Sequence, residues 1–254
     1  MSLQPVPAFE DNYIWLLRDT DGRALVVDPG DAAPVLAELG DGPAPHAILL
    51  THHHHDHIGG VEALLAHWPG LEVAAPRDDR IAEATRRVDD GDSVAVGPWR
   101  FEVLSIPGHT RTHVAYLGHG LLFCGDTLFS LGCGRMFEGT PAQMHASLQR
   151  LARLPGDTLA CGGHEYTAAN AAFALAVDPG NPALQARASR VRELRAGGKP
   201  SLPSRMAEER ACNPFLRCGD AAIRDAAERR AGRHLPDAVE VFAELRGWKD
   251  SFRA

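Results

Sequence analysis

The chain has 254 residues, with 33 acidic against 26 basic side chains and a formal net charge of −7. Hydrophobic residues make up 44% and charged residues 23%, proportions that are typical of a globular protein and exclude a disordered chain, a fibrous repeat and a disulfide-stapled miniprotein. The acidic balance also disfavours nucleic acid as a partner. Thirteen histidines are the feature of the composition that most needs an explanation.

We expect no membrane segment and no secretory signal. The first eleven residues carry neither the basic region nor the apolar region of a signal peptide. Charge-free stretches fall well short of the roughly 20 residues that a membrane span needs. The five cysteines are odd in number, and Cys124 and Cys161 lie in apolar runs, where a thiol behaves as a small hydrophobe. These features predict a reduced, cytoplasmic protein.

Short apolar runs between Gly, Asp and Pro turns predict strands in the first two-thirds of the chain. Several runs are too apolar for a sheet with one face in water, so both faces should be covered. Helical patterns lie between the runs, at Ile58–Trp68 and from Thr140, where Pro141 and Gln143 fit a capped start. Strands interleaved with helices predict an α/β or α+β layered domain. The predicted strands are Tyr13–Leu17, Ala24–Val27, Ala47–Leu50, Phe101–Ile106, Val114–Leu117, Leu121–Cys124 and Thr158–Cys161.

After Tyr166 the pattern changes, because no strand-like run of useful length follows. Caps and apolar spacing predict helices there. We therefore expect a first domain over 1–166 and a small all-helical domain over 167–254. The predicted helices run from Asn181-Pro182 to Ala196, from Asp220 to Ala231 and from Pro236 to Trp248.

Four of the predicted strands end in a loop that offers an imidazole or a carboxylate. The first of these loops contains Thr51 and the run His52-His53-His54-His55-Asp56-His57, and the others contain His109, Asp126 and His164. Loops at strand ends are where sites are assembled on a rigid scaffold. If the four strand ends converge, these side chains form one metal site.

The spacing within the first loop favours two ions. His52 and His54 are two residues apart, so an extended backbone points both to the same side. Asp56 and His57 begin the next helix and are directed at a second point nearby. With the residues of the other three loops they could serve two metal ions that share a water molecule, and imidazole suits zinc, iron and manganese alike.

Simpler interpretations explain single residues better than they explain the whole pattern. The histidine run could be a fragment of a purification tag or a metal-buffering tract, but it lies inside the chain between a strand and a helix. His109 or His164 alone would be a structural histidine, and Asp126 alone a turn residue. The chain lacks the Gly-x-Ser-x-Gly motif of serine hydrolases and the Gly-x-x-x-x-Gly-Lys motif of nucleotide-binding proteins.

The motif Thr51-His52-x-His54-x-Asp56-His57 resembles the signature of the metallo-β-lactamase-fold hydrolases, and His109, Asp126 and His164 fall where the remaining ligands should. More narrowly, the chain resembles glyoxalase II, the hydroxyacylglutathione hydrolases. The matching segments, which cover almost the whole chain, are Phe9-Glu10-Asp11-Asn12-Tyr13, Gly132-Cys133-Gly134-Arg135, Phe137-Glu138-Gly139-Thr140, Gly163-His164-Glu165-Tyr166-Thr167, Asn213-Pro214-Phe215 and Arg246-x-x-Lys249-Asp250.

The resemblance implies a four-layer αββα sandwich followed by the helical domain, which would bind glutathione. It implies that one metal is held by His52, His54 and His109. It also implies that the second metal is held by Asp56, His57 and His164, that Asp126 bridges the two, and that Asp28 supports the ligands. From the residues alone, Asp28 is equally well explained as part of an ordinary Asp-Pro-Gly turn. Zinc is the first expectation for both ions, with iron or manganese as alternatives.

The resemblance further implies a substrate site for the tripeptide. Arg135 and Tyr166 would contact glutathione, and Arg246 and Lys249 would hold its glycine carboxylate. From the residues alone, without the resemblance, these cations are better explained as part of a solvated helix face. Two positions depart from the family pattern: Arg135 replaces the more usual lysine, and Phe137 stands where a tyrosine is common. These departures affect the details of the glutathione pocket rather than the reaction class.

The predicted reaction is hydrolysis of S-D-lactoylglutathione to glutathione and D-lactate, the second step of methylglyoxal detoxification, by a hydroxide that bridges two metal ions. No catalytic residue apart from the metal ligands is expected, and the protein should act as a monomer. An iron-dependent glutathione persulfide dioxygenase on the same fold is the alternative, which the helical extension and the Arg246-x-x-Lys249 motif disfavour. A non-catalytic metal-binding protein is a third hypothesis.

Overall fold

The structure is a computed structural model that describes residues 1–40 and 42–253. The chain divides into two units, and each unit combines segments that are distant in the sequence. The first unit comprises Met1–Ser105, Thr112–Gly125 and Cys161–His164, and the second comprises Ile106–Arg111, Asp126–Ala160 and the chain from Glu165 onward.

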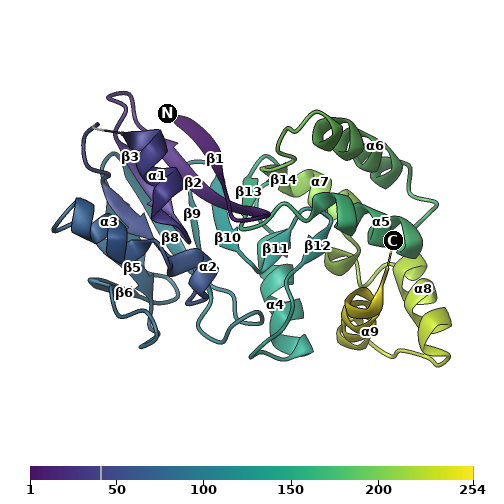
Figure 1. Ribbon diagram of the computed structural model, residues 1–254. Coiled ribbons are helices and arrows are strands. Elements are labelled where there is room, and N and C mark those ends of the chain that lie inside the picture. Colours follow the sequence, from purple (N-terminus) through teal and green to yellow (C-terminus); the bar gives the residue numbers. More distant parts are fainter. Residues whose placement is uncertain (41, 254) are drawn as a thin grey trace. The chain divides into compact units, whose positions relative to one another are not determined.

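A mixed six-stranded sheet forms one layer of the first unit, with the strand order β1-β2-β3-β4-β5-β6. Strands β1 to β3 are antiparallel and β3 to β6 are parallel. Parallel neighbours need a crossover connection, and α1 and α3 lie in two of these connections (Figure 1). The elements are β1 (Ser2–Ala8), β2 (Asn12–Arg18), β3 (Ala24–Val27), α1 (Ala32–Leu39), β4 (Ala47–Leu49), α2 (His55–Ile58), α3 (Val61–His67), β5 (Val73–Pro76) and β6 (Arg86–Val88).

Alternate residues of this sheet form a hydrophobic core with α1 and α3. Ile48 on β4 and Val73 on β5 pack in one cluster with Val35 of α1 and Leu64 of α3, and all four are fully buried. Since successive side chains of a strand point to opposite faces, the residues between them face the other way. Leu49 and Ala74, which point to that other face, are also fully buried, so both faces are covered, as the apolar runs predict.

A second six-stranded sheet has the order β14-β13-β10-β9-β8-β7. Buried polar contacts join it to the first sheet: the hydroxyl of Tyr116 lies 3.0 Å from the carbonyl oxygen of Leu50 and 3.1 Å from that of Ala74. The indole N–H of Trp15 donates to the carbonyl of Gly162 at 3.0 Å. The strands are β7 (Ser93–Val96), β8 (Trp99–Ser105), β9 (Val114–Gly118), β10 (Leu121–Gly125), β13 (Leu159–Gly162) and β14 (Ser204–Arg205).

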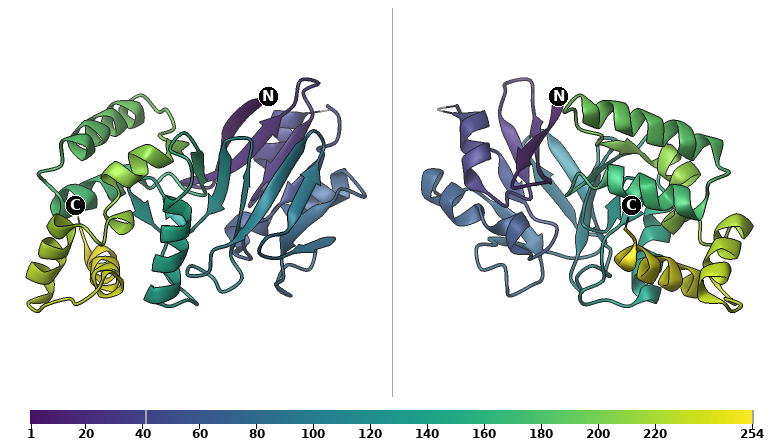
Figure 2. Two further views of the ribbon diagram at one scale, coloured as in Figure 1. Left: turned by 180° about the vertical axis from the view of Figure 1, so that it is seen from behind. Right: turned by 45° about the vertical axis from the view of Figure 1, so that its right-hand side comes forward.

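The second unit is mainly helical. Its helices pack in pairs, α5 on α6 and α8 on α9, and α4 also contacts α9 (Figure 2). Phe215 joins the pairs, because its ring lies 5.8 Å from those of Phe173 and Phe242. The elements are β11 (Leu128–Phe129), β12 (Gly132–Cys133), α4 (Pro141–Ala152), α5 (Thr167–Val177), α6 (Pro182–Ala196), α7 (Met206–Cys212), a short 3₁₀ helix (Pro214–Leu216), α8 (Ala221–Ala231) and α9 (Ala238–Ser251).

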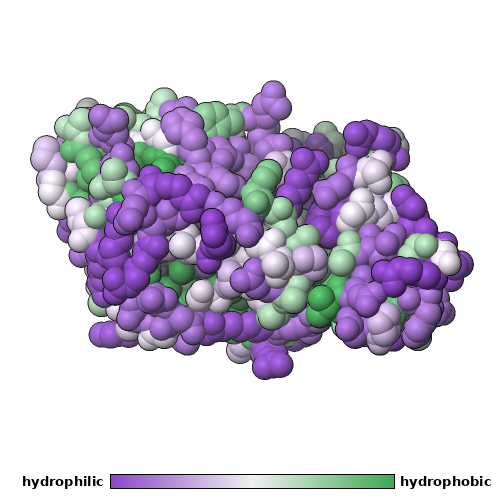
Figure 3. Space-filling view, turned by 90° about the horizontal axis from the view of Figure 1, so that it is seen from below, coloured by the Kyte–Doolittle hydropathy of each residue, from purple (hydrophilic) through white to green (hydrophobic). Residues whose placement is uncertain are grey.

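Few large hydrophobic side chains are exposed among the described residues. The face in Figure 3 is mostly hydrophilic, with small separate apolar areas. Among the described residues, the large hydrophobic side chains that are exposed are Met1, Phe9, Phe137 and Tyr166. Within the described ranges, no helix has the length and apolar character needed to cross a membrane.

The predicted helix at Ile58–Trp68 was wrong as a single element, because the chain forms α2 and α3 with a break at Gly59-Gly60. The break is caused by a segment elsewhere in the chain, because the backbone N–H of Gly60 donates to the carbonyl of Pro29 at 2.9 Å instead of continuing the helix. The close approach of that segment also requires glycine at position 60. The backbone of the turn that precedes α1 passes so close to Gly60 that an added Cβ would lie 2.5 Å from the amide nitrogen of Ala32 and 2.7 Å from the carbonyl oxygen of Pro29. Apolar spacing cannot reveal such an approach between distant segments. By contrast, the helix predicted to run from Pro182 to Ala196 is confirmed at both ends.

The capping box of α4 yields a test of local stability. The hydroxyl of Thr140 accepts a hydrogen bond from the backbone N–H of Gln143, whose side chain accepts one from the backbone N–H of Thr140. We expect Thr140→Ala to lower the free energy of unfolding by about 1 kcal/mol, because one amide loses its partner. Thr140→Ser, which keeps the hydroxyl, should stay close to the wild type. Urea denaturation measures both, and equal losses would contradict the role of the hydroxyl.

Candidate functional site

The loop that carries the histidine run begins at a buried carboxylate. Asp28, directly after β3, accepts hydrogen bonds from the backbone N–H of Thr51 at 2.8 Å and from its hydroxyl at 2.7 Å. The same Oδ2 atom lies 3.1 Å from Nδ1 of His57. Asp28 has a positive φ of 53°, a left-handed conformation that Asp tolerates better than most residues. Both ends of the loop therefore contact one residue that directly follows the neighbouring strand.

Asp56, His57 and His164 form a first candidate ligand group, entirely within the first unit. One ligand atom from each side chain lies within 4.8 Å of the others. Oδ2 of Asp56 is 3.6 Å from Nε2 of His57 and 3.3 Å from Nε2 of His164. His57 and His164 are almost fully buried. The remaining nitrogens of both rings are already occupied, so each ring turns Nε2 toward the same point.

The turn between β1 and β2 holds this group in place. Oδ1 of Asp11 lies 2.8 Å from Nδ1 of His164. The side-chain amide of Asn12 donates to Oδ2 of Asp56 at 2.9 Å. An isolated β-bridge between Asn12 and His164 and a backbone bond from Tyr13 to Gly163 attach the turn to the loop after β13. Asp11 and Asn12 are therefore positioning residues that the sequence analysis did not assign.

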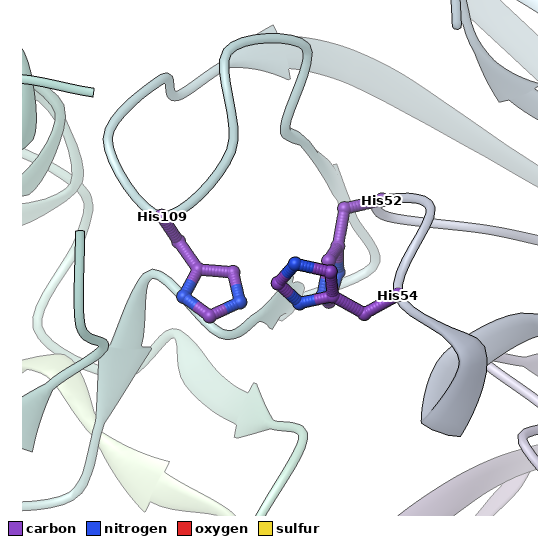
Figure 4. Close-up of side chains that lie close together, drawn as sticks. All are labelled: His52, His54 and His109. Carbon is purple, nitrogen blue, oxygen red and sulfur yellow. The ribbon is translucent and has the colours of Figure 1, made fainter. Parts of the chain in front are cut away.

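His52, His54 and His109 form a second candidate group. One nitrogen atom from each lies within 4.8 Å of the others, and Figure 4 shows the three rings with His52 and His54 on the loop after β4. Nδ1 of His109 lies 2.8 Å from the carbonyl oxygen of Arg135, which turns Nε2 to the other side. Nε2 lies 3.5 Å from Oδ2 of Asp126. Asp126 belongs to none of the groups found among the described residues, so its predicted bridging role stays a prediction.

The donor chemistry of these groups fits divalent metal ions. Neutral imidazoles supplemented by a carboxylate are suitable ligands for zinc, iron and manganese. Partners fix the orientation of the rings: Asp11 for His164, Asp28 for His57 and a backbone carbonyl for His109. Asp28 also groups with His52 and His57, but both of its oxygens accept hydrogen bonds from Thr51. We interpret it as a support for the ligands.

A pocket of about 450 Å³ lies within the second unit. His109 and Asp126 line it, and so do all five residues that were predicted to bind substrate, Arg135, Phe137, Tyr166, Arg246 and Lys249. Arg253 and Asp250 also line it and were not predicted. Four cations thus face two carboxylates, so the pocket attracts anions although the chain as a whole is acidic.

Arg246 is buried and firmly held on α9. It donates to the carbonyl of Cys133 at 2.9 Å and to Oδ1 of Asp250 at 3.1 Å, and its guanidinium lies 5.2 Å from the centre of the Phe215 ring. Its Nε is also buried and has no hydrogen-bond partner in the described part of the chain. Arg246 is therefore a structural element of the pocket lining, held by Cys133 and Asp250.

Lys249 and Arg135 complete the cationic lining. Nζ of Lys249 donates to the carbonyl of Ala169 at 3.2 Å. Burial, together with the neighbouring charge of Arg246, lowers the pKa of Lys249 to about 8. Arg135 is largely exposed, and its Nε lies 3.4 Å from Oδ1 of Asp250. The Oδ1 atom of Asp250 therefore contacts both Arg246 and Arg135.

Solved structures with a similar fold define the class of protein. ETHE1 from Myxococcus xanthus is similar with a TM-score of 0.65 and 25% identity, and the match covers 98% of both chains. BLEG-1 B3 metallo-beta-lactamase is similar with a TM-score of 0.64 and 23% identity, over 85% of this chain and 98% of that one. The model of the metallo-beta-lactamase superfamily matches residues 8–164. The chain has the metallo-β-lactamase fold, as predicted.

Sequence relatives narrow the class to a family. The model of the hydroxyacylglutathione hydrolase C-terminus matches residues 165–252. A hydroxyacylglutathione hydrolase of Xanthomonas campestris pv. campestris is 59% identical over 255 residues, which cover the whole of both chains. One of Xylella fastidiosa is 55% identical over 252 residues, 99% of this chain and 98% of the relative. The chain belongs to the hydroxyacylglutathione hydrolase family, which confirms the resemblance found in its sequence.

The Asp11–His164 pair yields a test of the metal site. Removal of the partner of a ligating histidine weakens metal binding about tenfold or more. We therefore expect Asp11→Ala to raise the dissociation constant for zinc about tenfold, measured by competition with a chelator.

Asp19→Ala is the matched control. Asp19 holds His46 in a similar pair, with 2.7 Å between Oδ2 and Nε2, but His46 belongs to neither candidate ligand group. Zinc affinity should not change in this variant. Equal losses in both variants, or an unchanged affinity in Asp11→Ala, would contradict the positioning role of Asp11.

Proposed function

We propose that this protein hydrolyses S-D-lactoylglutathione, or a related S-(2-hydroxyacyl)glutathione, to glutathione and D-lactate. The observation that carries the proposal is the pocket in which four cations lie beside His109 and Asp126. Such a pocket offers charge for an anionic tripeptide next to two candidate metal ligands. The names of the full-length relatives support the same activity.

The chemistry of the substrate explains the need for these cations. A glutathione thioester carries two carboxylates, which the pocket must remove from water. A guanidinium can bind a carboxylate through two parallel hydrogen bonds, whereas an ammonium acts as a point charge. Arg246 and Lys249 would bind the glycine carboxylate, and Arg135, Phe137 and Tyr166 would contact the rest of the tripeptide. Phe137 offers only an apolar face, because it has no hydroxyl.

The seven predicted ligands would hold two divalent ions. When bound, these ions would lower the pKa of a shared water molecule toward neutrality and polarise the carbonyl of the thioester. His52, His54 and His109 would hold one ion and Asp56, His57 and His164 the other, with Asp126 between them.

The chain's own residues provide orientation and charge. Asp11 and Asp28 keep His164 and His57 in fixed orientations. The cations of the pocket bind the glutathione part and so position the scissile bond. The leaving group is a thiolate whose conjugate acid has a pKa of roughly 8–9, so it departs without a strong general acid. We therefore propose no catalytic acid apart from the metal ligands.

We also propose zinc as the metal, a monomer as the active form and the cytoplasm as the compartment. Ligand sets that combine histidine and aspartate support zinc, with iron and manganese as the competing ions. TTHA1623, a solved structure with 30% identity over 65% of this chain, is a di-iron-bound form.

All five cysteines are buried free thiols, which supports the cytoplasm, a reducing compartment, as the location. We further propose that residues 167–254 form the glutathione-binding domain.

The proposal is tested by assaying thioester hydrolysis on a sample whose metal content is measured at the same time. We expect turnover of S-D-lactoylglutathione that disappears with a chelator and returns with zinc, and we expect about two metal ions per chain.

Lys249→Ala should raise KM with little change in kcat, because the charge of Lys249 contributes to substrate binding. Metal-loaded protein without turnover would refute the proposal, and oxygen consumption with glutathione persulfide would support the dioxygenase instead.

The lowered pKa of Lys249 predicts how binding depends on pH. A lysine is charged below its pKa, so this cation is present at pH 7 and is progressively lost as the pH rises through about 8. We expect KM for the thioester to rise several-fold between pH 7 and pH 9. Lys249→Arg keeps its charge throughout this range and should remove that rise. Parallel KM profiles for the two proteins would contradict this role of Lys249.

A further inference from the structure

Phe9 is an exposed aromatic residue in an unusual backbone conformation. It is the first residue of the three-residue turn between β1 and β2, in which Ala8 pairs with Asn12. Its φ is 51°, in the left-handed region that bulky side chains rarely adopt. Its side chain is nevertheless not buried, since 59% of the residue is accessible to solvent.

This turn is attached to candidate metal ligands of the first unit. Asp11 contacts His164 and Asn12 contacts Asp56, as described above. The ring of Phe9 lies against Gly30, where an added Cβ would be 2.9 Å from Cε2 of the ring. The same Cβ would collide with the carbonyl oxygen of Asp56. The exposed ring and the backbone of Asp56 therefore lie on the same side of Gly30.

The hydrophobic core does not explain this arrangement. Ala8 and Ile14, on either side of the turn, belong to the core cluster of the first sheet, but Phe9 does not. A left-handed conformation costs a bulky residue free energy, and such residues gather at sites of function. An exposed aromatic ring next to the backbone of a candidate metal ligand is a surface for an apolar ligand group.

We propose that Phe9 contacts the acyl group of the thioester and favours substrates with an apolar acyl chain. The inference rests on the proposed function. The carbonyl carbon of a thioester has two substituents, and the sulfur leads to the tripeptide that the cations bind. The acyl chain is the other substituent, and Phe9 provides an apolar surface close to the backbone of Asp56, which would hold one of the metal ions.

The experiment compares acyl groups of different size and polarity. We expect Phe9→Ala to lower kcat/KM for S-mandeloylglutathione about fivefold or more, while kcat/KM for S-D-lactoylglutathione changes less than twofold. Phe9→Leu, which keeps an apolar side chain, should restore most of the loss. Phe137→Ala is the matched control, because Phe137 is also exposed but lines the cationic pocket, so its removal should affect both thioesters equally.

A second measurement does not depend on turnover. Metal-free protein is titrated with S-benzylglutathione and S-methylglutathione, whose S-substituents take the place of the acyl group. Phe9→Ala should weaken only the binding of the benzyl compound. Metal content and melting temperature of the variant should match those of the wild type.

Three results would overturn the inference. The first is an equal loss of kcat/KM for both thioesters in Phe9→Ala, and the second is unchanged kinetics with all substrates. The third is a lower metal content in Phe9→Ala, which would make Phe9 a structural support for Asp56. A wild-type protein that hydrolyses no glutathione thioester would instead refute the proposed function, so the two failures are distinguishable.

Discussion

The carboxylate of Asp28 is the contact on which the site depends most. It accepts two hydrogen bonds from Thr51, at the start of the histidine loop, and faces His57 near its end. Since Asp28 directly follows β3 and Thr51 follows β4, two adjacent parallel strands determine where the loop begins. A loop held at both ends loses few conformational states on metal binding, so its ligands are preorganised.

The turn between β1 and β2 has the same effect on a loop far away in the sequence. Asp11 and Asn12 stand about 150 residues before His164, yet they orient its ring and hold Asp56 in register with it. Buried imidazoles such as those of His57 and His164 are costly to desolvate unless each polar atom has a partner. These pairs supply such partners, and they bring charged residues from three separate segments into one group.

Some of this organisation could be predicted from the sequence, and some could not. Ala24–Val27 is confirmed residue for residue as a strand, because a short apolar run between turns has few other solutions. The break between α2 and α3 could not be predicted, because the turn that crowds Gly60 approaches it only in the folded chain.

The same limit applies to the site. Histidines at strand ends stand out in the sequence, whereas the partners Asp11, Asn12 and Asp250 are ordinary surface residue types whose roles depend on tertiary contacts. The sequence motif that resembles a family includes Asp11 and Asn12, but it does not say which ligand each one holds.

The pocket shows why net charge is a poor guide to the ligand of this protein. The chain carries a formal charge of −7, yet the pocket has four cations against Asp126 and Asp250. Interactions between exposed charges are screened over about 8 Å at physiological ionic strength, so an anion inside the pocket is governed by its immediate neighbours. Asp250 pairs with Arg246 and Arg135 and limits their repulsion while the pocket is empty. The electrostatic cost of gathering four cations in one pocket is thereby reduced, which allows the pocket to keep its positive charge in an acidic chain.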